Sequence, residues 1–119
     1  MMIEELIEKL KAATGPDANL DEALNQYFLM IEGYPTASID AALILFKAIF
    51  PDGPDQHYSM TIWTGRNPAA RLMYHQRDAD AEGGWGIGWL NHPFEVRART
   101  EPLAICLAVL EAIHSRDAA

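Results

Sequence analysis

The spacing of apolar residues changes once along the chain. Over the first fifty residues they recur every three or four positions, which predicts amphipathic helices at 3–11, 20–31 and 36–50. The segment 36–50 is apolar almost all the way round, so we expect a helix that is buried on most of its surface and around which the smaller elements pack. Asn19 is the predicted N-cap of the second helix, and Thr36 or Ser38 that of the third.

Beyond residue 50 the period becomes two, which predicts strands at about 57–63, 71–75, 85–89 and 94–98. Thr100 then precedes a last, strongly apolar helix. Short connections between strands favour antiparallel pairing, and segregated helices and strands are typical of the α+β class. We therefore expect one domain over residues 1–119, with about four antiparallel strands, three N-terminal helices and one C-terminal helix.

Three segments resemble the phage ABA sandwich domain family. YPTASIDAALILF, at 34–46, resembles the family's Y-T-A-S-x-D-A-A-L segment, and RTEPLAICLAVLEA, at 99–112, resembles its A-T-P-x-L-A-L-C-x-A-A-L segment. ATGPDANLDEAL, at 13–24, resembles its T-G-P-x-x-x-L-D start. The chain departs from the family at Pro35 and Glu101. The resemblance implies an α/β/α sandwich and a phage or prophage origin; the family has no generally assigned activity, so no catalytic residue is transferred.

Composition narrows the classes of partner. The formal net charge is −8 and the sequence pI is about 4.8, which argues against general binding to nucleic-acid backbones or to anionic membranes. The start, MMIEELIEKLK, has acids where a signal peptide has basic residues, and no apolar run is long enough for a membrane span, so we expect a cytoplasmic protein. Cys106 is the single cysteine and is expected to be a buried apolar side chain. No cofactor is expected.

Candidate chemistry gathers on the polar face of the predicted sheet. Clustered Arg and His can bind an anion or an acidic peptide, and His with Glu and Ser can perform acid–base or acyl chemistry. The alternative is a solvated face, or one that the first helix partly covers. The histidines lack metal-binding spacings, so no metal site is expected. If the strands pair in simple order, this face contains His57, Ser59, Arg71, His75, Glu95, Arg97 and Arg99.

The tryptophans are divided between the two faces. Trp63 falls on the polar face beside Thr61 and is the best candidate for an exposed interface anchor. Trp85 and Trp89 share a face with Ile87 and are expected in the core.

These patterns contain no catalytic motif. We therefore predict a small phage- or prophage-encoded accessory protein without enzymatic activity, which acts in the bacterial cytoplasm by binding a host protein, with an inhibitor of host defence as one form. The predicted binding residues are Trp63, His57, Arg71, His75, Arg97 and Arg99. One alternative is a small-molecule- or anion-binding domain or small enzyme, which needs a deep pocket that gathers His75, Arg97 and Arg99. The other is a structural phage component that self-assembles, for instance as a homodimer.

Overall fold

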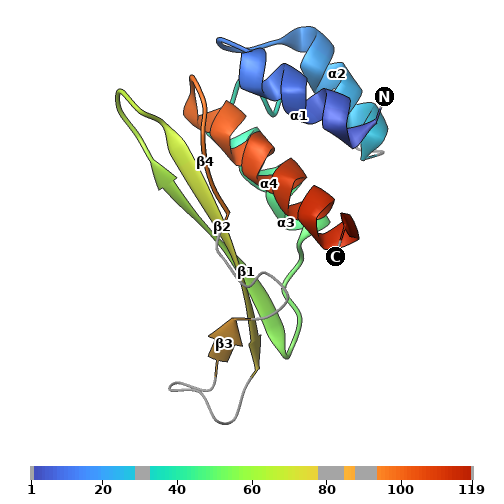
Figure 1. The fold of residues 1–119 in the computed structure, drawn as a ribbon, viewed down its shortest axis with the longest axis vertical. Coiled ribbons are helices and arrows are strands. Elements are labelled where there is room, and N and C mark those ends of the chain that lie inside the picture. The colour runs from blue at the N-terminus through green and yellow to red at the C-terminus, as the bar shows by residue number, and fades with distance from the viewer. Residues whose placement is uncertain (1, 29–32, 78–84, 88–93, 119) are drawn as a thin grey trace.

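The computed structural model describes residues 2–28, 33–77, 85–87 and 94–118, and it has the predicted order of helices and strands (Figure 1). This confirms the α+β class. Trp89 lies outside the described residues, as does the predicted end of the second helix. The elements are α1 (Ile3–Ala12), α2 (Ala18–Tyr27), α3 (Ile39–Ile49), β1 (Gln56–Trp63), β2 (Ala69–Arg77), β3 (Trp85–Ile87), β4 (Phe94–Arg97) and α4 (Glu101–Ala118).

The sheet is antiparallel and is centred on β2. One edge of β2 pairs with β1 in a register that places Tyr58 opposite Tyr74. The other edge pairs with β4 at one end and with β3 at the other, so these two short strands lie one after the other along β2. Among the described residues, the sheet is therefore only three strands wide at any level.

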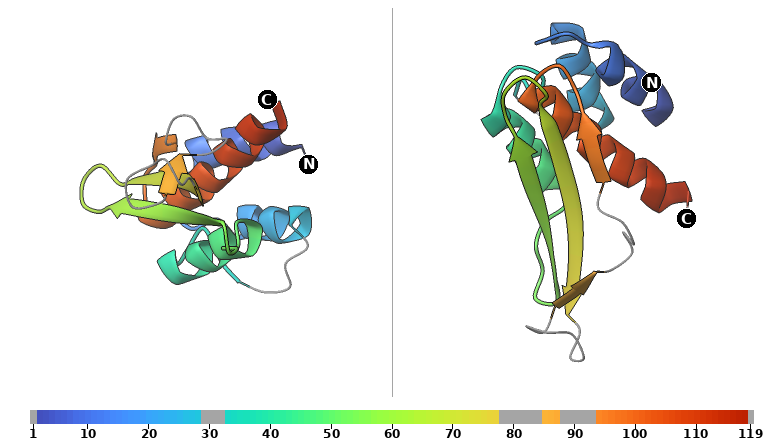
Figure 2. Two further views of the ribbon diagram at one scale, coloured as in Figure 1. Left: turned by 90° about the horizontal axis from the view of Figure 1, so that it is seen from below. Right: turned by 60° about the vertical axis from the view of Figure 1, so that its left-hand side comes forward.

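The described helices lie over one face of this sheet (Figures 1 and 2). The even-numbered side chains from Tyr58 to Ile62 of β1 and from Ala70 to Tyr74 of β2 point into the core, where the Tyr58 ring lies 4.8 Å from that of Phe50, at the end of α3. Helix α4 contacts β1, β2 and β4, whereas α1 packs on α4 and α2. The layers therefore run from the sheet to α4 and α3 and then to α1, an order different from that of an α/β/α sandwich. Helix α1 does not cover the polar face.

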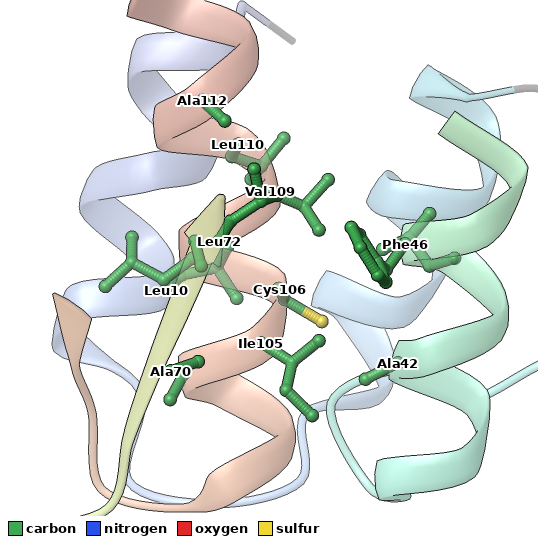
Figure 3. Close-up of a cluster of buried hydrophobic side chains, with 14 of the residues drawn as sticks. Leu10, Ala42, Phe46, Ala70, Leu72, Ile105, Cys106, Val109, Leu110 and Ala112 are labelled. Atoms are coloured by element: carbon green, nitrogen blue, oxygen red, sulfur yellow. The ribbon is translucent and has the colours of Figure 1, made fainter. Parts of the chain in front are cut away.

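Helix α4 is the central element of the core. Every residue from Pro102 to Leu110 is buried. Figure 3 shows the reason: side chains of α4 meet Leu10 of α1, Leu72 of β2 and Phe46 of α3 on different sides of the helix. The prediction that 36–50 is a helix buried on most of its surface, around which the chain is organised, is therefore wrong. Helix α3 packs on α4 through one face, and Ile44 on its outer face is 63% exposed.

The helix caps explain where α2 and α3 begin. Asp17, and not Asn19 as predicted, is the N-cap of α2, because its Oδ1 accepts the backbone N–H groups of Asn19 and Leu20 at 2.9 and 3.1 Å. Ser38 caps α3 by accepting the N–H of Ala41 at 3.3 Å.

Thr36 has a different role from the predicted cap. It is fully buried, and both its N–H and its hydroxyl donate to Oδ1 of Asp21 at 2.8 Å. Its Oγ1 also accepts the N–H of Asp17 at 2.9 Å. Thr36 therefore ties the start of α2 to the segment that leads into α3. Next to it, the thiol of Cys106 donates to the carbonyl of Pro35 at 3.4 Å, and burial raises the pKa of this thiol, as expected for a buried cysteine.

Candidate functional site

The structure places most of the predicted site residues on one face of the sheet, opposite α4. The alternation of side chains puts the odd-numbered residues of β1, and those of β2 from Ala69 to His75, on this face, which we call the open face. The register then decides which residues are neighbours: His57 lies opposite His75, Arg71 lies between Thr61 and Glu95, and Ala69 lies between Trp63 and Arg97. Arg99 is exposed just beyond the end of β4.

The open face does not bring these residues into one pocket. His75 and Ala69, the neighbour of Arg97, are six residues apart on β2, which at about 3.3 Å per residue is roughly 20 Å. The histidines therefore lie at one end of the sheet, and Trp63 lies with Arg97 at the other. The pocket that would gather His75, Arg97 and Arg99 is not formed by this register.

The histidine end is a stacked pair. The rings of His57 and His75 lie 4.4 Å apart between centroids and 13° from parallel, and Nε2 of His75 is 3.2 Å from the hydroxyl of Ser59. Burial, and then the charge of His57, lower the pKa of His75. Because the two rings are nearly parallel, their nitrogen atoms point in parallel directions and do not converge on one point, as the ligands of a metal ion do. Among the described residues, no group of three or more His, Cys, Asp or Glu is placed to hold a metal.

Among the described residues, Glu95, the acid of the predicted His, Glu and Ser combination, does not lie at this end. Glu95 pairs with Arg71, four residues along β2 from His75, or about 13 Å away. Glu95 therefore cannot orient the imidazole of His75 toward Ser59. The predicted combination of His, Glu and Ser shares a face but is not assembled.

The tryptophan end forms a hollow of about 380 Å³ where β1 turns into β2. Trp63 is 40% exposed and forms part of its wall. The turn between β1 and β2 contains Gly65 at a φ of 108°. The next two residues, Arg66 and Asn67, line the hollow. We call this region the Trp63 surface; it is lined by Trp63, Thr64, Arg66, Asn67, Ala69, Glu95 and Arg97.

The Trp63 surface and the residues next to it hold four arginines beside one lining acid, Glu95, in an acidic protein. Arg66 and Arg97 line the hollow, Arg71 lies two residues along β2 from the lining residue Ala69, and Arg99 follows β4 at the same end. These are four of the nine Lys and Arg residues in a chain of net charge −8. The sequence pattern did not single out Arg66 or Asn67, because turn residues follow no period. The sequence could have indicated these two residues only by their position in the turn that follows Trp63, the predicted exposed Trp at the end of a strand.

Comparison of the sequence with known protein families finds no match, and neither the search of curated proteins nor that of solved structures finds a similar protein. In the part of the chain that the structure describes, no helix has the length and apolar character that crossing a membrane requires.

Proposed function

We propose that this chain is a small phage- or prophage-encoded accessory protein that binds a host protein through the Trp63 surface. The observation that carries the proposal is an exposed Trp beside a hollow with two Arg side chains, on the sheet face that the described helices leave uncovered. Trp and Arg are the residues most enriched among those that dominate binding energy at protein interfaces. The phage origin rests on the sequence resemblance, and the bacterial cytoplasm is then the place of action.

The charges on this surface indicate the partner's chemistry. Arg66 and Arg97 offer planar guanidinium groups that bind carboxylates through paired hydrogen bonds, and Trp63 offers a large apolar face. The matching partner surface carries Asp or Glu beside an apolar side chain. A component of host antiviral defence is the form of partner that a phage-encoded inhibitor would engage.

A non-enzymatic role is supported by the geometry of the open face. His75 and Ser59 are in contact, but Glu95 and Arg71 lie at a level about 13 Å along the sheet from His75, and Arg97 lies further still. Binding through Trp63 needs none of these groups to converge.

Affinity capture with matched variants tests the proposal. The immobilised protein is incubated with bacterial host lysate, and captured proteins are compared among wild type, Trp63→Ala and Tyr34→Ala. Tyr34 is 69% exposed on the segment that leads into α3, so its substitution removes a similar exposed aromatic ring elsewhere. We expect a partner that wild type and Tyr34→Ala retain and Trp63→Ala loses. With the purified partner, Trp63→Ala should raise Kd by about 30-fold or more.

Two results would contradict the proposal. One is that wild type captures nothing beyond the unmodified matrix. The other is that Trp63→Ala retains every protein that Tyr34→Ala retains.

A small anionic ligand is a second candidate for the same hollow, because two arginines line a space of about 380 Å³. Titration calorimetry with inorganic phosphate tests it. Heat of binding that Arg97→Gln abolishes and Trp63→Ala preserves would favour the small ligand over the protein partner.

A further inference from the structure

The outer edge of β1 is open over its second half. Tyr58 shows which backbone groups point to this edge, because its N–H donates to Asp52 at 3.1 Å and its carbonyl accepts from Lys47 at 3.2 Å. Backbone groups of an antiparallel strand point alternately to its two edges, so those of Met60 and Ile62 also point outward. Among the described residues, no strand and no side chain pairs with these outward groups of Met60 and Ile62.

This edge lacks the features that keep strands from pairing with other chains. Natural edge strands are short, or carry Lys, Pro or a bulge. Strand β1 has eight residues, contains no Lys, Arg, Asp, Glu or Pro, and pairs with β2 in a register without a bulge. Lys47 and Asp52 protect only the level of Tyr58. The edge from Met60 to Ile62 is therefore suited to pairing with another strand.

Helix α3 adds an apolar contact on the same side. Ile44 lies three residues before Lys47, so the two side chains emerge on the same side of the helix, and Lys47 reaches the outer edge of β1 at Tyr58. Ile44 is 63% exposed. The right-hand view of Figure 2 shows α3 behind β1, at the side of the sheet away from β4. A partner at this edge therefore meets an unpaired strand and an apolar helix side chain together.

We propose that a second copy of this chain occupies the edge, with the two β1 strands antiparallel about a two-fold axis at Thr61. Met60 of each copy then exchanges backbone hydrogen bonds with the partner's Ile62, and Thr61 lies opposite the partner's Thr61. A second copy fits because β1 carries no Asp, Glu, Lys or Arg, so self-pairing sets no such charges against each other. The symmetry also matches every open donor with an open acceptor.

The same symmetry supplies a partner for Ile44. The axis stands perpendicular to the joined sheet, so the two α3 helices lie on the same side and each brings its exposed Ile44 toward the junction. The Lys47 and Asp52 contacts at Tyr58 end the ladder in both copies. The joined sheet also places two Trp63 surfaces on one continuous open face, so that one dimer would present two binding sites. Dimerisation does not depend on the proposed host partner.

Sedimentation of the purified protein over a concentration series tests the dimer. A short ladder buries little area, so we expect a weak, concentration-dependent dimer. Thr61→Lys places two like charges opposite each other at the axis and should raise the dimer's Kd by about tenfold or more. Asn67→Lys, in the exposed turn after β1, adds the same charge away from the edge and should leave the dimer unchanged.

Disulfide trapping tests the register. Thr61 is exposed and would face its own copy in a non-hydrogen-bonded pair, where Cβ atoms are about 4.5–5.5 Å apart, close to disulfide reach. Thr61→Cys should therefore form a cross-linked dimer on mild oxidation, and Asn67→Cys should not; the native Cys106 is buried and does not compete. A monomer at every concentration overturns the proposal, as does a dimer that Thr61→Lys leaves intact. A dimer sensitive to Thr61→Lys that Thr61→Cys fails to cross-link overturns the axis at Thr61.

Discussion

Thr36→Val should destabilise the protein far more than its near-identical shape suggests. The substitution keeps the volume of a fully buried side chain and removes only the hydroxyl. That hydroxyl donates to Asp21 at 2.8 Å and accepts the N–H of Asp17 at 2.9 Å. Asp21 keeps one donor, the N–H of Thr36. Asp17 loses the acceptor of its backbone N–H.

The two losses give the magnitude. A hydrogen bond to a charged group contributes about 1.5–3 kcal/mol, and a buried donor left without a partner costs about 1–3 kcal/mol. Because the Asp17 N–H is only partly buried, its cost lies at the low end. We therefore expect a loss of about 3 kcal/mol in the free energy of unfolding. For a chain of this size that corresponds to a fall of roughly 10 °C in Tm.

Urea unfolding followed by circular dichroism measures the change, with Thr64→Val as the matched control. Thr64 is exposed after β1, and we expect its substitution to change stability by less than about 0.5 kcal/mol. A double-mutant cycle that adds Asp21→Ala should give a coupling energy of about 1 kcal/mol or more. A loss at Thr36 no larger than the loss at Thr64, or a coupling energy near zero, would refute the proposed link between α2 and the start of α3.

Three further predictions follow from burial and titration. Leu110→Ala in α4 should lower the free energy of unfolding by about 2–5 kcal/mol, and Ile44→Ala in α3 by less than about 0.5 kcal/mol in the monomer; equal losses in urea unfolding would contradict the central position of α4. Because the folded pKa of His75 is lowered, its unfolded state binds more protons near pH 6. Stability should therefore fall as the pH drops below about 7, by at most about 1.4 kcal/mol per pH unit, and His75→Gln should flatten the curve; a slope that survives this change would contradict the role of His75. The Cys106 thiol should resist a thiol-specific reagent at pH 8 until urea unfolds the chain, and rapid labelling of the native protein would contradict its burial and raised pKa.

Local patterns predicted the elements, because each pattern reflects a local constraint. The period of two identified which side chains of β1 and β2 face the core, and Tyr58 and Leu72 are buried there. Thr100 is near the start of α4 as expected, where its Oγ1 accepts the N–H of Leu103 at 3.4 Å. The cap of α2 was harder, since Asp17 and Asn19 both suit an N-cap and only the backbone path decides between them.

The candidate site was predictable as a face and not as a pocket. Alternation assigns His75 and Arg97 to one side of the sheet, but it says nothing of how far apart the pairing places them. That distance depends on the register of β2 with β4, which sets Arg97 opposite Ala69 rather than beside the histidines. The arginine of the β1–β2 turn, Arg66, joins the site only because the chain reverses there.

The misassigned central helix has an informative cause. Segments 36–50 and 101–116 are both apolar on more than one side. Apolarity by itself does not show which of these two segments is surrounded by the other elements. Helix α4 follows β4 directly and folds back across the sheet, so it contacts strands on one side and α1 and α3 on others. Helix α3 meets α4 on one face and leaves Ile44 exposed. That exposed side chain, together with the edge of β1 that is unpaired among the described strands, is the observation on which the proposed dimer rests.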